Sequence, residues 1–212
     1  FYTLANMKKM TIAFTFFLIL ACNSKDKRPL MGKTVYQQEL NASYKDASKS
    51  PLKKRDLKNF KGLDFFPVDS TFIVIANLTK TINAPTFEMA TTTDRKPLYK
   101  EYGILKFNLK GKKCVLKIYQ SQDDLRDKKY KNHLFLPFTD DTSGEESYGG
   151  GRYMDVMTTD EKADGTIELN FNNTYNPYCA YNDKYSCPLT PRKNHLDVEV
   201  KAGIKVFEKD SY

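Results

Sequence analysis

The chain contains few of the residues on which common catalytic and metal sites depend. Its 212 residues include no tryptophan, two histidines and four cysteines. With only His133 and His195 available, histidine-based catalysis has few routes. The nucleophile elbow Gly-x-Ser-x-Gly, the Walker loop and the metalloprotease motif His-Glu-x-x-His are all absent from the sequence. No nucleic-acid-binding motif accompanies the positive charge, so we expect no nucleic-acid partner.

The N-terminal segment has the pattern of a bacterial lipoprotein signal peptide. Met7 is followed by two lysines, an almost wholly apolar run over residues 10–20, and then Ala21-Cys22. The run is too short for a membrane-spanning helix and is typical of a cleaved secretory signal. We therefore predict an upstream extension and signal peptide over residues 1–21, with lipid attached to Cys22. The alternative is a plain signal peptide followed by a chance cysteine.

A lipidated Cys22 would hold the protein at a membrane, because two or three acyl chains form a stable anchor. Residues 22–34 are polar and charged and are interpreted as a flexible tether. The expected location is the cell envelope, either the periplasmic face of the outer membrane or the cell surface. The membrane, reached through the lipid anchor, is the first expected partner.

The net charge of +8 is concentrated in two short segments. One interpretation is an anionic partner, either a small anionic ligand or an anionic envelope surface. The other is an ordinary solvated surface. The basic residues concerned are Lys53, Lys54, Arg55, Lys58, Lys61, Lys128, Lys129 and Lys131.

Residues 35–212 are predicted to form a single β-rich domain. Residues 103–119 alternate apolar and polar side chains on both sides of Lys110-Gly111, which is typical of a β-hairpin with one wet face. Shorter strand patterns cover residues 71–78, 86–91, 134–138, 167–171 and 196–200, whereas helical patterns cover 35–47 and 52–60. The expected fold is mainly β: a single antiparallel β-barrel or sandwich domain with short N-terminal helices.

Residues 140–153 combine acidic, hydroxyl and glycine residues with one arginine. The acidic residues could hold a hard cation, could divide acid and base roles, or could satisfy a local turn. The glycines at 149–151 allow close approach of the backbone to a ligand, and Arg152 could add a fork for a carboxylate or phosphate. Alternatively, the glycines form a sharp bend and Arg152 pairs with Asp140, Asp141 or Asp155 inside the fold.

The remaining cysteines suggest a structural bridge more than a reactive site. Cys114 lies in a strand pattern and is interpreted as a small buried residue. Seven residues separate Cys179 from Cys187, and an exported chain lives where disulfides persist, so we predict a disulfide between them. Two free thiols, a Cys179 nucleophile with His195 as base, and a zinc site formed by Cys179, Cys187 and His195 are alternatives. The tyrosines at 175, 178 and 181, with Asn176, could line a polar-aromatic pocket.

Five sequence blocks resemble, in order, the motifs of the domain-of-unknown-function family DUF1684. They are residues 60–69 (FKGLDFFPVD), 134–144 (LFLPFTDDTSG), 148–153 (YGGGRY), 169–172 (LNFN) and 175–180 (YNPYCA), the last together with Cys187-Pro188. The resemblance extends from about residue 60 to residue 203. It implies motif positions and no activity, because the family has no assigned reaction. His195 falls where the family pattern does not require histidine.

From these patterns we predict an envelope lipoprotein that binds a small polar or anionic ligand without a cofactor or a metal. A competing hypothesis is a hydrolase-like enzyme with Asp140 or Glu146 as base and Arg152 stabilising negative charge. A third is a purely structural envelope domain in which Arg152 is a buried ion-pair partner. The residues predicted for the ligand site are Asp140, Thr142, Tyr148, Gly150, Arg152, Asn176 and Tyr178.

Overall fold

The computed structural model describes residues 32–208, apart from the side chain of Arg126. The predicted signal peptide, the lipidation site Cys22 and most of the tether therefore lie outside the described residues. No helix within the described range is long and apolar enough to cross a membrane.

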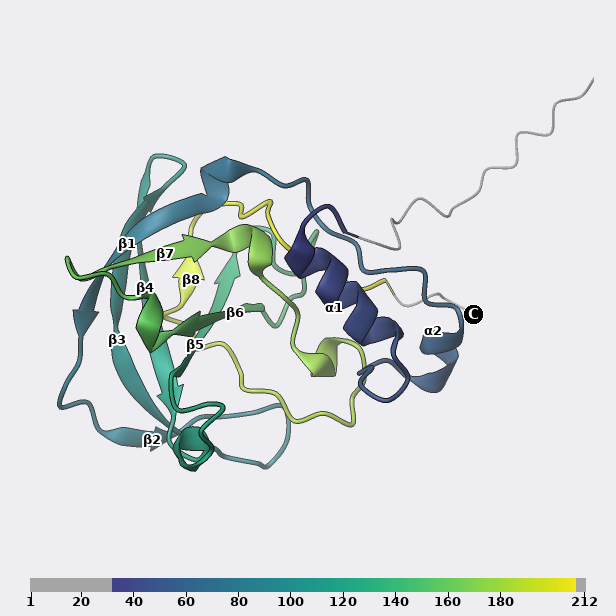
Figure 1. Cartoon of the computed structure of the whole chain (residues 1–212), viewed down its shortest axis with the longest axis horizontal. Coiled ribbons are helices and arrows are strands. Elements are labelled where there is room, and N and C mark those ends of the chain that lie inside the picture. Colours follow the sequence, from purple (N-terminus) through teal and green to yellow (C-terminus); the bar gives the residue numbers. More distant parts are fainter. Residues whose placement is uncertain (1–31, 209–212) are drawn as a thin grey trace, which may run out of the picture.

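One curled, mainly antiparallel sheet forms the body of the domain (Figure 1), which confirms the predicted fold class. Its main path has the order β6-β5-β4-β3-β1-β7, with β2 added to β3 and β8 added to β5. The pairing of β8 with β5 is parallel and all other strand pairs are antiparallel. The strands are β1 (Ile73–Lys80), β2 (Thr86–Glu88), β3 (Leu98–Leu109), β4 (Lys112–Ser121), β5 (His133–Asp140), β6 (Arg152–Met157), β7 (Thr166–Asn170) and β8 (His195–Leu196).

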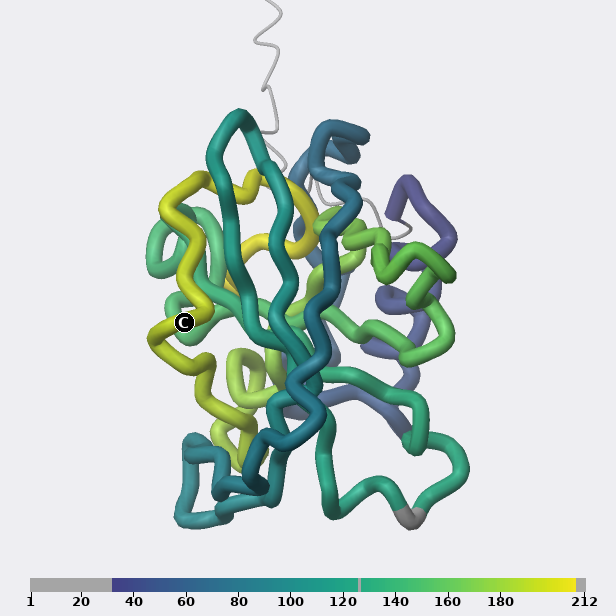
Figure 2. The backbone as a smooth tube through the Cα atoms, turned by 90° about the vertical axis from the view of Figure 1, so that its left-hand side faces the viewer, coloured from purple at the N-terminus to yellow at the C-terminus, as the bar shows by residue number. Residues whose placement is uncertain are grey.

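The predicted hairpin is the long β3–β4 ribbon, which stands at the top of Figure 2. Leu105, Phe107 and Leu109 are buried, whereas the residues between them are exposed on the opposite face. Lys110 and Gly111 both have positive φ, at 49° and 79°, which is the geometry that a tight two-residue hairpin turn requires. The alternation that predicted this element therefore corresponds directly to its two faces.

Within the described residues, two short helices precede the sheet, as predicted. Helix α1 (Val35–Lys45) begins after Thr34, whose side chain accepts a hydrogen bond from the backbone N–H of Gln37. Helix α2 (Lys54–Lys58) follows after Pro51. Figure 1 shows both helices on the side of the domain away from β1 and β3.

In the part of the chain that the structure describes, buried apolar residues form three clusters. The largest fills the curl of the sheet and includes Leu116, Leu134 and Phe171. A second cluster lies beneath the helices and is centred on Tyr44 and Tyr181. The third is almost entirely aromatic and consists of Met89, Tyr99, Tyr119, Phe135 and Tyr153, with Tyr175 packed against it.

The C-terminal segment differs from its predicted strand. Buried and exposed side chains do alternate over residues 196–200, since Leu196, Val198 and Val200 are buried between exposed neighbours. Only His195–Leu196 joins a ladder, however. The carbonyl groups of Val200, Ala202 and Ile204 instead accept hydrogen bonds from the side chain of Arg152. A side-chain donor thus replaces the neighbouring strand.

The aromatic cluster predicts a loss of stability at high pH. Burial raises the pKa of both Tyr99 and Tyr119 to about 12. Between pH 10 and pH 12 these phenols ionise in the unfolded chain but stay protonated in the folded state. Their contribution to the free energy of unfolding is therefore complete below pH 10 and is lost as the pH rises from 10 to 12. Each tyrosine should reduce the free energy of unfolding by up to about 1.4 kcal/mol per pH unit in this range.

Urea unfolding between pH 8 and pH 12 measures this effect. The Tyr99→Phe/Tyr119→Phe variant, which cannot ionise at these positions, should lose less stability than the wild type. Parallel curves for the two proteins would contradict the assignment.

Candidate functional site

A fully buried ion pair joins the end of β5 to the start of β6. Arg152 Nη2 lies 2.7 Å from Asp140 Oδ2, and both side chains are 0% exposed. The guanidinium also donates to the carbonyl groups of Val200 (2.8 Å) and Ala202 (2.6 Å), and it stacks between two rings, those of Phe66 and Phe138. Enclosure of this kind leaves no access for a ligand to the guanidinium in this structure.

The acidic loop is organised around the same carboxylate. Asp140 Oδ1 accepts hydrogen bonds from the backbone N–H and the hydroxyl of Thr142, at 2.9 and 2.7 Å, and from the N–H of Val200 at 3.1 Å. Thr142 in turn contacts the hydroxyl of Ser147 at 2.8 Å. Glu146 faces outward and pairs with Lys201. The two carboxylates of the hydrolase hypothesis therefore lie in different environments, one enclosed and one on the surface.

The glycine triplet forms the bend that leads into β6. Gly151 has a φ of 92°, and a Cβ at this position would lie 2.6 Å from the carbonyl oxygen of Phe138. Only glycine fits this combination of conformation and close approach. The carbonyl of Gly150 accepts a hydrogen bond from the hydroxyl of Thr190. The triplet thus closes a turn.

The seven residues predicted to share one ligand site lie in different environments. Asp140, Thr142 and Arg152 form the buried network, and Gly150 lies in the exposed turn. Asn176 is buried, and its amide donates to the carbonyl of Lys205 at 2.8 Å. Tyr148 packs against the cluster beneath the helices, and Tyr178 lines a pocket described below.

Cys179 and Cys187 are brought together as free thiols. The backbone N–H of Cys179 lies 3.1 Å from the sulfur of Cys187. A hydrogen bond from the Cys187 thiol lowers the pKa of Cys179 to about 7, despite partial burial, and Tyr148 and Thr92 act in the same direction. The disulfide remains a prediction for the oxidised chain. Cys114 is buried, in agreement with its interpretation as a small core residue.

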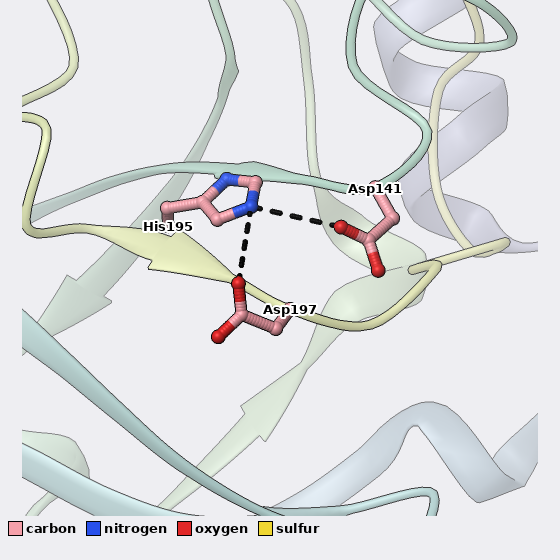
Figure 3. A group of neighbouring side chains, drawn as sticks. All are labelled: Asp141, His195 and Asp197. Atoms are coloured by element: carbon pink, nitrogen blue, oxygen red, sulfur yellow. Dashed lines mark ion pairs between the residues drawn. The ribbon is translucent and has the colours of Figure 1, made fainter.

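His195 lies with two carboxylates and not with the cysteines (Figure 3). Its Nε2 is 3.6 Å from both Asp141 Oδ1 and Asp197 Oδ1, and its Nδ1 contacts the hydroxyl of Thr139 at 3.0 Å. All three side chains are exposed. This is the one group of three or more metal-ligating side chains found among the described residues, and it contains no cysteine. We assign no metal to it, because exposed acidic groups are common without a bound ion.

A pocket of about 440 Å³ opens between helix α1 and the sheet, and we call it the tyrosine pocket. Its walls are unusually rich in rings, with seven tyrosines and one phenylalanine. They come from α1, β3, β5, β6 and the segments at 175–178 and 185–188. The lining residues are Tyr36, Leu40, Tyr44, Tyr99, Phe135, Tyr153, Asp155, Tyr175, Pro177, Tyr178, Tyr185, Ser186, Cys187 and Pro188.

Asp155 provides the charge of this pocket. Its Oδ1 lies 2.8 Å from His133 Nε2 and accepts a hydrogen bond from the hydroxyl of Tyr175 at 2.6 Å. Burial raises the pKa of Tyr36, Tyr175 and Tyr178, and the negative charge of Asp155 raises them further. These hydroxyls therefore remain neutral hydrogen-bonding groups at ordinary pH.

Only part of the pocket could be found from sequence. Tyr175 and Tyr178 were predicted for a polar-aromatic pocket and do line one, whereas Tyr181 and Asn176 are buried beside it. Tyr36 and Tyr44 lie within the helical pattern predicted over residues 35–47. The remaining rings come from separate strands, and no short-range signal connects them.

The ion pair yields a direct test of its structural role. In an Arg152→Ala variant, Asp140 stays buried without a countercharge and the carbonyl groups of the C-terminal segment lose their donor. We expect a loss of about 3–5 kcal/mol in the free energy of unfolding, which chemical denaturation measures. Lys201→Ala, which breaks a solvent-exposed pair with Glu146, is the matched control and should leave the unfolding midpoint almost unchanged. An Arg152→Ala variant with unchanged stability would contradict the structural role.

Comparison with known proteins places the chain in a family without assigning it an activity. No curated protein matches it. The solution NMR structure of the uncharacterized protein from gene locus rrnAC0354 of Haloarcula marismortui is similar, with 34% identity and a TM-score of 0.62. The match covers 80% of this chain and 89% of the other. The family model described as protein of unknown function DUF1684 matches residues 58–205, and the chain belongs to this family.

Proposed function

We propose that the protein is a cell-envelope lipoprotein whose domain binds a small polar ligand in the tyrosine pocket. The observation that carries the proposal is the pocket itself, with its ring-lined walls and its few polar groups. Its volume of about 440 Å³ lies in the range of small-molecule sites, which are typically apolar clefts with a few oriented polar groups.

The walls are suited to binding because their rings are held in place before a ligand arrives. Tyr153 packs edge-on against Phe135 and Tyr175, with ring centroids 4.7 and 5.9 Å apart. Tyr178 packs in the same manner against Tyr185 at 5.2 Å. Aromatic side chains offer a large contact area and lose little conformational entropy when they are already packed.

The buried network at Arg152 supports this choice of site. Apart from Arg152 Nε, its polar atoms have hydrogen-bond partners within the protein, so a ligand there would have to displace an ion pair and several hydrogen bonds. The tyrosine pocket requires no such displacement. Asp140 is buried and Glu146 lies on the surface, so the two carboxylates of the hydrolase hypothesis do not share a catalytic centre.

The predicted lipid anchor would keep the pocket close to the membrane. Tyr36, at the start of α1, is 14 residues from Cys22 in the chain. Even a fully extended segment of this length spans at most about 50 Å. The ligand would therefore be met within a short distance of the envelope surface.

Lipidation can be tested in cells that express the full chain. We expect radiolabelled palmitate to be incorporated into the wild type and to be lost in Cys22→Ala. Absence of label from the wild type would contradict the anchor and would leave the pocket proposal unaffected.

Ligand binding can be tested with benzyl alcohol as a small, neutral aromatic probe. The full chain, labelled with 3-fluorotyrosine and held in a non-ionic maltoside detergent, is titrated while fluorine NMR reports on its tyrosines. We expect saturable shifts of a subset of resonances in the wild type. Leu40→Trp should weaken binding about tenfold or more, because it adds bulk inside the pocket.

Val35→Trp is the matched control for this experiment. Val35 lies on the same helix, is 70% exposed and does not line the pocket, so the added ring should leave binding unchanged. Partition of the probe into micelles would produce the same linear drift in all three proteins. No saturable shift in the wild type, or equal binding in the two variants, would refute the pocket as a ligand site.

A further inference from the structure

The walls of the tyrosine pocket have a charge pattern opposite to that of the chain. The sequence holds 34 lysines and arginines against 26 acidic residues. Nevertheless, none of the described residues lining the pocket is lysine or arginine, and one, Asp155, is acidic. An anion in this pocket would meet a carboxylate and no cationic wall, so the anionic ligand expected from sequence is disfavoured here.

Asp155 retains capacity for a charged ligand. Both of its hydrogen bonds, to His133 and Tyr175, use Oδ1. Its side chain is 54% exposed and lines the tyrosine pocket. Burial raises the pKa of three tyrosines in the walls, and the negative charge of this carboxylate raises it further.

The rings supply the second attraction. Each aromatic face carries partial negative charge and attracts a cation that lies over it. Because neighbouring rings meet at steep angles, 88° for Tyr153 and Tyr175 and 60° for Tyr178 and Tyr185, their faces point in different directions around the space. Lys184, which does not line the pocket, already places its Nζ 4.8 Å from the centroid of the Tyr185 ring.

From this geometry we infer that the tyrosine pocket binds a small organic cation of the alkylated ammonium class, held by ring faces and by Asp155. The inference rests on the proposed function and adds the chemical class of the ligand. Alkylation matters because the largely apolar walls cannot replace the hydration of a bare ammonium group, whereas an alkylated cation is weakly hydrated and fits ring surfaces.

Three compounds of similar shape but different charge show whether charge determines the affinity of the pocket. Choline carries the cation, 3,3-dimethylbutanol is its neutral isostere, and pivalate carries a carboxylate on the same branched carbon group. Isothermal titration calorimetry measures their affinity for the full chain in maltoside detergent. We expect choline to bind about tenfold or more tightly than 3,3-dimethylbutanol, and pivalate to bind most weakly.

Two variants identify the source of the preference. Asp155→Asn should reduce choline affinity to about that of the neutral isostere, whereas Asp141→Asn, the same charge change at an exposed position outside this pocket, should have no effect. Tyr178→Leu keeps an apolar side chain but removes one ring, so it should weaken choline several-fold and 3,3-dimethylbutanol much less. Thermal unfolding of each variant establishes that the fold is retained.

The outcomes distinguish this inference from the proposed function. Equal affinity for choline and 3,3-dimethylbutanol, or tighter binding of pivalate, would overturn the cationic class. So would retention of full choline affinity in Asp155→Asn and Tyr178→Leu. If choline does not bind but benzyl alcohol binds saturably, the cationic class of ligand is refuted and the pocket stands as a ligand site. If neither probe binds, the pocket itself is refuted as a ligand site.

Discussion

The buried pair of Asp140 and Arg152 is the interaction on which the arrangement of this domain depends. Its two members lie at the end of β5 and the start of β6, and its remaining hydrogen bonds reach the C-terminal segment and the acidic loop. A charge pair removed from water is costly unless further hydrogen bonds compensate for the lost hydration. Here the carboxylate accepts four hydrogen bonds, counting the one from Arg152, and the guanidinium donates to three carbonyl groups in addition. One network therefore joins the end of β5 and the start of β6 to a C-terminal segment that lies 48 to 60 residues away in sequence.

The same network determines how the pocket is presented. Alternate residues of a strand face opposite sides, so an inward Arg152 places Tyr153 and Asp155 on the other face of β6. Met154 and Val156 follow Arg152 into the main core, whereas Tyr153 and Asp155 line the tyrosine pocket. Phe135 of β5 pairs in register with Asp155 and joins the same wall. Slippage of β6 by one residue would exchange the two sets of side chains.

The sequence predicted elements well where a strand has one wet face. The hairpin at 103–119 is an example, because its buried and exposed residues alternate visibly. Strand β6 was not among the strand patterns, because polar Arg152 is buried on one face with Met154 and Val156, whereas buried Tyr153 and exposed Asp155 share the other face. The final segment showed correct alternation but forms no extended ladder, because its carbonyl groups are satisfied by a distant side chain. Such a substitution of donors depends on tertiary contacts that the local pattern does not contain.

The candidate site was the harder problem, and the reason is chemical. Arginine, glycine and acidic residues in a short run resemble a binding motif because each has a special geometry or charge. A buried polar network demands the same special residues, since every donor must meet its acceptor and every tight turn its glycine. Tyrosines, in contrast, resemble ordinary core, because their rings pack like other apolar groups. In this domain the chemically distinctive motif closes the fold, and the less distinctive aromatic residues surround the open space. A pocket of rings with a single carboxylate is therefore visible only after distant strands and α1 have been brought together.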